Sequence, residues 1–218
     1  MRKILCSLSC LIMIICLTVS ITGCNSDSAS SVKSISNSNK SNVSKKEEKK
    51  YMTGKHNIKI EVEDYGDIEV ELDADTAPIT VTNFINLVKD GFYDGLTFHR
   101  IIDGFMIQGG DPNGNGTGGS SEKIKGEFSS NGVENNISHK RGVISMARAS
   151  YSMDSASSQF FIVHEDSEFL DGQYAAFGHV TSGMDVVDKI CDKVEVEDSN
   201  GTTLKKNQPV IKKISVID

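Results

Sequence analysis

The chemistry that this sequence can support is best seen around Arg100, which lies between apolar runs in FHRIIDGFMIQGGD. Met106 and Gln108 are two residues apart, so they face the same side of an extended strand, and Gln159 and Phe161 do the same in SSQFFIV. One guanidinium, two amides and several Phe and Met side chains predict a shallow apolar pocket with a few directed hydrogen-bond donors. A lone arginine in a strand is more often a surface or ion-paired residue, but these neighbours favour the pocket.

Three other kinds of site have little support. GNGTGG at 114–119 has the glycine spacing of a dinucleotide-binding loop, but no apolar-periodic helix follows it and no lysine–serine pair completes a phosphate loop. The histidines are scattered without metal-ligand spacing, and no Cys-x-x-Cys pair accompanies them. ASSQFF lacks the G-x-S-x-G turn of a nucleophile elbow. We therefore expect no metal, no nucleotide or other cofactor, and no covalent catalysis, and we interpret the glycine loop as shaping a surface.

Short strands joined by glycine-rich loops must position the pocket residues. Alternating apolar residues at 58–62 and 68–72, on either side of a turn with Gly66, predict a β-hairpin. Helix start and stop signals frame a segment from Pro78 to Gly91, and a second helix is predicted over 183–194. Further strands are predicted at 96–102, 104–108, 142–146, 159–163, 175–180 and in the C-terminal IKKISVID. Many short strands with two helices predict a mainly β fold, a closed or nearly closed barrel.

Residues 1–23 have the pattern of an export signal: Arg2 and Lys3 precede a long uncharged apolar run. The run ends in Ile-Thr-Gly-Cys, which resembles the lipobox of bacterial lipoproteins, and that resemblance implies a lipid on Cys24. An ordinary signal peptide and an uncleaved anchor helix remain alternatives. In each case the domain is exported, and the lipoprotein form predicts an extracytoplasmic protein, lipid-anchored to the cell membrane.

Residues 24–54, which are mostly Ser, Asn and Lys, predict a disordered tether. The tether is basic, which suits either an anionic membrane surface or a merely solubilising linker. The formal net charge of −7 for the whole chain includes Arg2, Lys3 and a net +3 within 25–50, so the remainder carries about −12. Such an acidic domain, over residues 55–218, argues against nucleic acid as a partner.

Cysteine usage predicts no intramolecular disulfide in the mature protein. Three of the five cysteines lie in the leader, and Cys24 is assigned to the lipid, which leaves Cys191 alone. Cys191 lies in the apolar-periodic stretch VVDKICDKV, so we expect a buried structural thiol.

Three longer blocks resemble the signature blocks of the cyclophilins, in the order found in that family: FHRIIDGFMIQGGDPNGNGTGG, GVISMARASYSMDSASSQFFIVHE and FLDGQYAAFGHV. The resemblance runs through nearly all of 55–218, and SMARAS is closer to bacterial members. It implies a peptidyl-prolyl cis-trans isomerase with a closed eight-stranded antiparallel β-barrel capped by two α-helices. It also implies a monomer that acts on proline-containing polypeptides without a cofactor.

The same resemblance implies a role for each matched position. Arg100 matches the catalytic arginine, and Gln108 matches the glutamine that orients the arginine and the substrate. The positions that match the proline-ring pocket are Phe105, Met106, Phe161 and Leu170, and those that match the groove for the preceding residues are Ala147, Arg148, Ala149 and Gln159. Gly116 matches a loop glycine beside that groove.

Three substrate-binding positions depart from the common family pattern. Phe169 stands where many members have tryptophan, and Tyr174 stands where many have histidine. Both keep an aromatic ring, so we expect proline binding to survive, but Phe169 has no indole N–H and we expect weakened binding of cyclosporin. Arg148 replaces a common asparagine, which matters little if that position contacts substrate through its backbone.

Two functions other than catalysis by an exported isomerase fit the same residues. A binding module or holdase chaperone would capture proline-containing segments with incidental turnover. A structural surface lipoprotein would need no pocket at all. The presence of both Arg100 and Gln108 favours the enzyme, because capture alone requires less.

Overall fold

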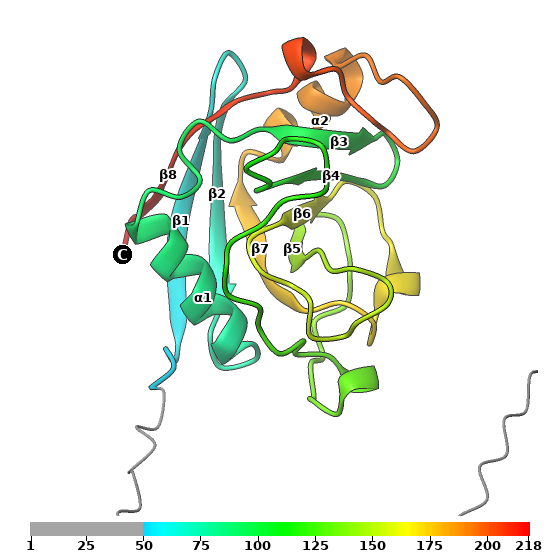
Figure 1. The fold of residues 1–218 in the computed structure, drawn as a ribbon. Coiled ribbons are helices and arrows are strands. Elements are labelled where there is room, and N and C mark those ends of the chain that lie inside the picture. Colours follow the sequence, from blue (N-terminus) through cyan, green and yellow to red (C-terminus); the bar gives the residue numbers. More distant parts are fainter. Residues whose placement is uncertain (1–49) are drawn as a thin grey trace, which may run out of the picture. The chain divides into compact units, whose positions relative to one another are not determined.

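A computed structural model describes residues 50–218 as one sheet with two α-helices and three single-turn 3₁₀ helices (Figure 1). The strands are β1 (Lys55–Val62), β2 (Gly66–Asp73), β3 (Phe98–Ile102), β4 (Met106–Gly109), β5 (Val143–Met146), β6 (Phe160–Val163), β7 (Ala176–Ser182) and β8 (Ile211–Val216). The helices are α1 (Pro78–Lys89) and α2 (Met184–Lys193), and the 3₁₀ turns are Ser129–Asn131, Glu168–Leu170 and Lys205–Asn207. The proposed signal peptide, Cys24 and the tether up to residue 49 lie outside the described residues.

The sheet is open, so the prediction of a closed barrel is wrong. All eight strands pair antiparallel, in the order β3-β4-β6-β5-β7-β2-β1-β8, and the sheet curls into a half-barrel with β3 and β8 at its edges. Between the edges there is no continuous ladder among the described residues. Isolated bridges pair Thr97 with Val210 and Arg100 with Thr202, and Ile211 of β8 exchanges backbone hydrogen bonds with Gly95 and Leu96. The segment before β8 contains a 3₁₀ turn and Pro209, which has no N–H to donate, so it cannot continue the ladder.

Side-chain alternation along the strands divides the sheet into two apolar faces. In β1 and β2 the residues Ile58, Ile60, Ile68 and Val70 are fully buried, as predicted, and they belong to the main core inside the curl. In the centre of the sheet, Ile107 enters that core while its neighbour Met106 points the other way. Met106, Val143, Phe161, Val163, Leu170 and Ala176 form a second, smaller cluster. The predicted pocket residues therefore lie on the outer face of strands whose inner face is core.

Both predicted helices are confirmed, and each begins without a side-chain cap of its own. α1 has Pro78 in its first turn, and the buried carboxylate of Glu127 accepts hydrogen bonds from the amides of Ile79 (3.0 Å) and Thr80 (2.8 Å). α2 buries one side, including Cys191, whose pKa is raised to about 12 chiefly by burial. Neither helix, nor any other among residues 50–218, combines the length and apolar character needed to cross a membrane.

Candidate active site

An apolar hollow of about 320 Å³ lies on the outer face of the sheet, over β4 and β6. Met106, Phe161 and Leu170 form its buried base, and Phe105 and Tyr174 stand at its sides. The Phe161 and Tyr174 rings meet edge to face with centroids 5.9 Å apart. Phe169 is 72% exposed at the rim, where its ring lies 5.5 Å from that of Phe105. The structure thus brings together every residue that the sequence assigned to the proline ring, and the hollow suits a small apolar ring.

Arg100 borders this hollow and is held from two sides. Its Nε donates to the backbone oxygen of Asn200 (2.8 Å), and its Nη2 donates to Oδ1 of the same residue (3.2 Å). On the other side its Nη1 donates to Oε1 of Gln108 across 3.3 Å. Partial burial lowers the pKa of Arg100 from its ordinary value, and Tyr174 and Asp198 oppose that shift. A guanidinium remains protonated at neutral pH even so, and it is aimed into the pocket as a fixed donor.

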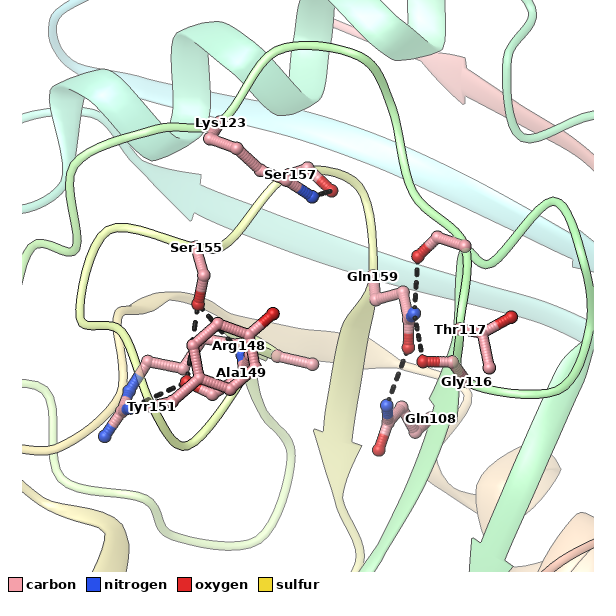
Figure 2. A pocket seen from close by; sticks show the side chains of 12 residues that line it. Gln108, Gly116, Thr117, Lys123, Arg148, Ala149, Tyr151, Ser155, Ser157 and Gln159 are labelled. Atoms are coloured by element: carbon pink, nitrogen blue, oxygen red, sulfur yellow. Dashed lines mark hydrogen bonds between the residues drawn. The ribbon is translucent and has the colours of Figure 1, made fainter.

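Gln108 continues a chain of hydrogen bonds across the sheet. Its Nε2 donates to Oε1 of Gln159 (2.9 Å), and Nε2 of Gln159 donates to the carbonyl oxygens of Gly118 (2.8 Å) and Gly116 (3.1 Å), as Figure 2 shows. The glycine loop therefore orients both amides, which in turn orient the guanidinium. The loop is itself fixed by Asp111, whose buried carboxylate accepts three backbone N–H groups.

A second hollow of about 350 Å³ adjoins the first and shares Gln108, Ala147 and Arg148 with it. The predicted groove residues Gly116, Ala149 and Gln159 line it. Thr117 and Gly118 of the glycine loop also line it, as do Lys123, Tyr151, Ser155 and Ser157, which sequence patterns alone did not single out (Figure 2). The two hollows together form an extended surface that fits a proline and the residues before it.

The Arg148 side chain folds back instead of reaching over the groove. Its Nε donates to the backbone oxygen of Gln173 (2.9 Å), and its guanidinium lies 4.9 Å from the Tyr174 ring centroid and 5.4 Å from that of Phe128. The charge therefore braces the side of the hollow through cation–π contacts.

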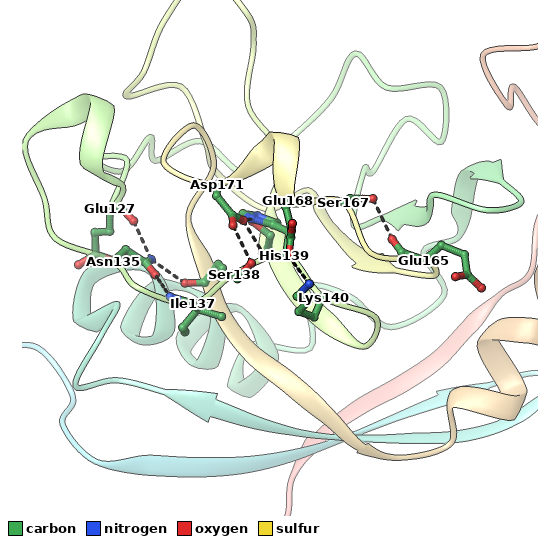
Figure 3. Close-up of polar contacts among 12 residues, drawn as sticks. Glu127, Asn135, Ile137, Ser138, His139, Lys140, Glu165, Ser167, Glu168 and Asp171 are labelled. Atoms are coloured by element: carbon green, nitrogen blue, oxygen red, sulfur yellow. Dashed lines mark hydrogen bonds and ion pairs between the residues drawn. The ribbon is translucent and has the colours of Figure 1, made fainter.

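Behind Phe161 lies a polar chain, with His139 and Ser145 buried and Asp171 at the surface, that sequence reasoning missed. Nδ1 of His139 is 2.8 Å from Oδ1 of Asp171, and Nε2 is 3.0 Å from Oγ of Ser145. Figure 3 shows His139 against Asp171 and Ser138. The order Ser-His-Asp is that of a hydrolase triad, but Ser145 is fully buried and no substrate carbonyl can reach it. The imidazole stacks on Phe161 with centroids 6.0 Å apart, so this chain fixes the base of the pocket.

Asn200, which holds Arg100, was also missed. It lies in the stretch DSNGTT, which has the composition of an ordinary surface turn and gives no sign of a partner a hundred residues away. Sequence reasoning also gave no role to His99. This residue is buried beside Arg100, and neither of its ring nitrogens has a hydrogen-bond partner among the described residues.

Comparison with known proteins assigns the chain to a protein family. Residues 57–216 match the family model described as cyclophilin type peptidyl-prolyl cis-trans isomerase/CLD. The chain belongs to the cyclophilin family. Peptidyl-prolyl cis-trans isomerase B of Bacillus subtilis is 46% identical over 145 residues, which is 66% of this chain and 92% of that protein. A peptidyl-prolyl cis-trans isomerase of Helicobacter pylori is 49% identical over 127 residues, 57% of this chain and 74% of that protein.

A solved structure has the same fold. A cyclophilin type peptidyl-prolyl cis-trans isomerase of Cryptosporidium parvum, crystallised in the presence of the dipeptide Ala-Pro, superimposes with a TM-score of 0.65 at 31% identity. The match covers 74% of this chain and 99% of that one. The enzyme class predicted from the sequence, peptidyl-prolyl cis-trans isomerase, is thereby confirmed.

Proposed function

We propose that this cyclophilin isomerises X–Pro bonds of exported polypeptides, with Arg100 as its catalytic residue. The observation that carries the assignment is the donor geometry: the Arg100 guanidinium lies beside the apolar hollow and is fixed by Asn200 on one side and Gln108 on the other. Because both partners hold it in place before any ligand arrives, its donors need no reorganisation during the reaction.

The reaction requires a selective donor and no nucleophile. Rotation about an X–Pro amide is slow because resonance opposes twisting, with a barrier of roughly 18–20 kcal/mol. In the twisted state the proline nitrogen becomes pyramidal and gains a lone pair, which a guanidinium N–H of Arg100 would contact. A planar amide offers no such acceptor, so the hydrogen bond would stabilise the transition state over both ground states.

The two hollows supply the remaining requirement, which is to hold one half of the bond while the other half turns. The base formed by Met106, Phe161 and Leu170 would fix the proline ring. The second hollow, from Gly116 to Ala149, would hold the residues before proline in an extended conformation. Rigid packing behind Phe161 supports this division, since the His139 chain leaves that ring little freedom.

The cellular setting is part of the proposal and rests on the leader sequence. The lipobox-like Ile-Thr-Gly-Cys would place a lipid on Cys24, and the basic tether would hold the domain close to the outer surface of the membrane. There the enzyme would accelerate folding of secreted proteins, whose uncatalysed X–Pro isomerisation takes tens to hundreds of seconds. Mass spectrometry of the protein from membranes tests the anchor, because a diacylglyceryl adduct on Cys24 is expected and an unmodified Cys24 contradicts it.

Isomerisation of a short X–Pro peptide by residues 50–218, beside Arg100→Ala, tests the catalytic assignment. We expect rapid turnover by the wild type and a loss of roughly 10²–10³-fold in kcat/KM in the variant, as for removal of one preorganised donor. Circular dichroism must show both proteins folded. Equal turnover in both would refute the role of Arg100, and a folded wild type without turnover would favour a binding module that captures proline segments.

A further inference from the structure

We propose that Asp103, His164 and Cys191 form a binding site for a thiophilic divalent cation, of which Zn²⁺ is the best match, beneath the β3–β4 turn. One ligand atom from each of the three side chains lies within 4.8 Å of the other two. They come from separate elements, since Asp103 lies in the β3–β4 turn, His164 follows β6 and Cys191 belongs to α2. Only folding brings these side chains together, because 60 residues lie between Asp103 and His164 in the sequence and another 26 lie between His164 and Cys191.

The spacing of two ligands already fits a single metal ion. Nδ1 of His164 and Oδ1 of Asp103 are 3.4 Å apart. Ligands about 2.0–2.2 Å from a tetrahedral Zn²⁺ lie roughly 3.3–3.5 Å from each other. The Cys191 sulfur, at its longer bond of about 2.3 Å, would have to approach by no more than about 1.3 Å. A change of this size is within the reach of rotations of the Asp103 and Cys191 side chains.

The histidine is presented as metal-ligating histidines usually are. Its Nε2 is 3.1 Å from Oδ1 of Asp188, and Asp188 is in turn paired with Arg141 at 2.7 Å. Nδ1 accepts the amide N–H of Gly104 at 3.0 Å, so the proton resides on Nε2 and Nδ1 carries the lone pair, which a cation would take over from the Gly104 amide. A carboxylate that fixes the tautomer of a ligating imidazole in this way is the common outer partner of zinc sites.

Among the three proposed ligands, the thiol is the one without a hydrogen-bond or ion-pair partner among the described residues. Cys191 is only 8% exposed, and its sulfur has no hydrogen-bond partner among residues 50–218. Asp103, by contrast, has a side chain that is 81% exposed, which leaves the cluster open to solvent on one side. A cation would enter past Asp103, take the thiolate, imidazole and carboxylate as three ligands and keep a water as the fourth, with release of the thiol proton.

The mixed donor set restricts the choice of metal. A thiolate and an imidazole favour Zn²⁺ or a similar thiophilic ion, whereas Mg²⁺ and Ca²⁺ prefer oxygen ligands throughout.

A metal ion bound at this site would change the position of Phe105 at the side of the proline pocket. The amide of His164 donates to the carbonyl of Phe105 at 2.8 Å, and the amide of Gly104 donates to the His164 ring. A metal on Nδ1 replaces the Gly104 hydrogen bond, so the turn that presents Phe105 must shift. We therefore expect the bound metal to raise KM for an X–Pro peptide. This effect on KM rests on the proposed function, whereas binding of the metal does not.

Cadmium absorption tests the site directly in residues 50–218, which include the whole segment that matches the cyclophilin family model and contain Cys191 as their single cysteine. Cd²⁺ should produce an ultraviolet thiolate-to-metal charge-transfer band that saturates at one ion per chain, and added Zn²⁺ should abolish it. Cys191→Ser should remove the band. Asp103→Asn, on an exposed turn where folding is not at risk, should weaken Cd²⁺ binding at least roughly tenfold, and Asp188→Asn by roughly 10–100-fold.

His179→Gln is the matched control, because His179 is exposed in β7 and takes no part in the cluster. It should bind Cd²⁺ as the wild type does. A folded wild type that shows no thiolate band would overturn the site. So would a band of unchanged affinity in both Asp103→Asn and His164→Gln, since sulfur alone would then account for it. The charge-transfer band is measured without substrate, so the test of the metal site does not depend on the outcome of the isomerase assay.

Discussion

Arg100 in β3 and Gln108 in β4 lie directly opposite each other in the antiparallel register, and Nη1 of the arginine donates to Oε1 of the glutamine across 3.3 Å. Cross-strand partners share one face of a sheet, so the backbone ladder sets the separation of these two side chains before either makes a contact. The donor that we assign to catalysis is thus positioned by the pairing of β3 with β4, and its surroundings can be tested residue by residue.

Gln108→Leu removes the bridge between the guanidinium and Gln159. The fold should persist because Gln108 faces the outer side of the sheet, but Arg100 keeps only its Asn200 partners and the weaker Nη1 contact to Sδ of Met106 (3.9 Å). We expect kcat/KM for an X–Pro peptide to fall up to about tenfold, the equivalent of one net hydrogen bond. An unchanged kcat/KM with an unchanged melting temperature would show that Asn200 alone suffices to orient Arg100.

Asn200→Ala tests the opposite side of the guanidinium. The variant loses the Nη2 contact to Oδ1 of Asn200 but retains the Nε contact to its backbone oxygen, so a severalfold loss in kcat/KM is expected, smaller than that of Arg100→Ala. Asn207→Ala, in the neighbouring 3₁₀ turn, serves as the control and should retain full turnover. Steady-state kinetics on both variants would decide, and equal activities would exclude Asn200 from the mechanism.

Phe169→Trp should increase the affinity for cyclosporin. Phe169 stands exposed at the rim of the hollow, so the larger ring can be accommodated, and the indole adds an N–H donor that phenylalanine lacks. One added hydrogen bond corresponds to a gain of up to about tenfold in Kd. Calorimetric titration beside Phe169→Leu separates the donor from simple ring size, because the leucine variant should bind more weakly than the wild type.

His99 makes stability depend on pH in the mildly acidic range. Burial lowers the pKa of His99 from its ordinary value of 6.5, and nearby Asp111 only partly opposes this. The unfolded chain therefore binds a proton that the folded chain rejects, and the free energy of unfolding should decrease as pH falls below about 6.5, by at most about 1.4 kcal/mol per pH unit for one such group. His139 shifts in the same direction, chiefly through burial.

Urea unfolding of the wild type and His99→Gln between about pH 7.5 and 5 checks this dependence. The variant should show a shallower decrease over that range, because one of the two groups with a depressed pKa is gone. Carboxylates with lowered pKa, such as Asp111, change their protonation at lower pH and do not interfere. Parallel curves for the two proteins would mean that His99 titrates normally.

Glu127→Ala should destabilise the domain by roughly 2–4 kcal/mol. At the start of α1, the carboxylate of Glu127 accepts hydrogen bonds from the Ile79 and Thr80 amides and from the Thr80 hydroxyl. In the alanine variant these three donors would be left without their acceptor. Glu127→Gln retains an oxygen acceptor and should lose less. Thermal and urea denaturation measure both, and equal losses would indicate that volume and not hydrogen bonding accounts for the effect.

Much of the local structure was accessible to sequence reasoning because its signals are local. Alternation in β1 and β2, Pro78 at the start of α1 and the apolar period of α2 each reflect neighbours within a few residues. The pocket residues were identified by their resemblance to signature blocks, in which the chemistry of proline recognition is concentrated in short stretches.

Contacts between distant segments were not accessible in this way. Asn200 meets Arg100, and Asp171 meets His139, only because the fold brings loops from distant parts of the sequence against other segments. Closure of the barrel was predicted wrongly for the same reason. Whether β3 and β8 pair depends on how the curl brings two edges together and on the 3₁₀ turn and Pro209 between them, which no single segment encodes.

The sequence by itself determined the family, the types of side chain in the site and the alternation that puts Met106 and Phe161 on one face. Tertiary structure alone decided which partners fix Arg100, that the sheet stays open, and that Asp103, His164 and Cys191 converge beneath the β3–β4 turn. The physical reason is that propensity and periodicity act over a few residues, whereas orientation of a donor and convergence of ligands depend on sheet register and packing across the whole domain.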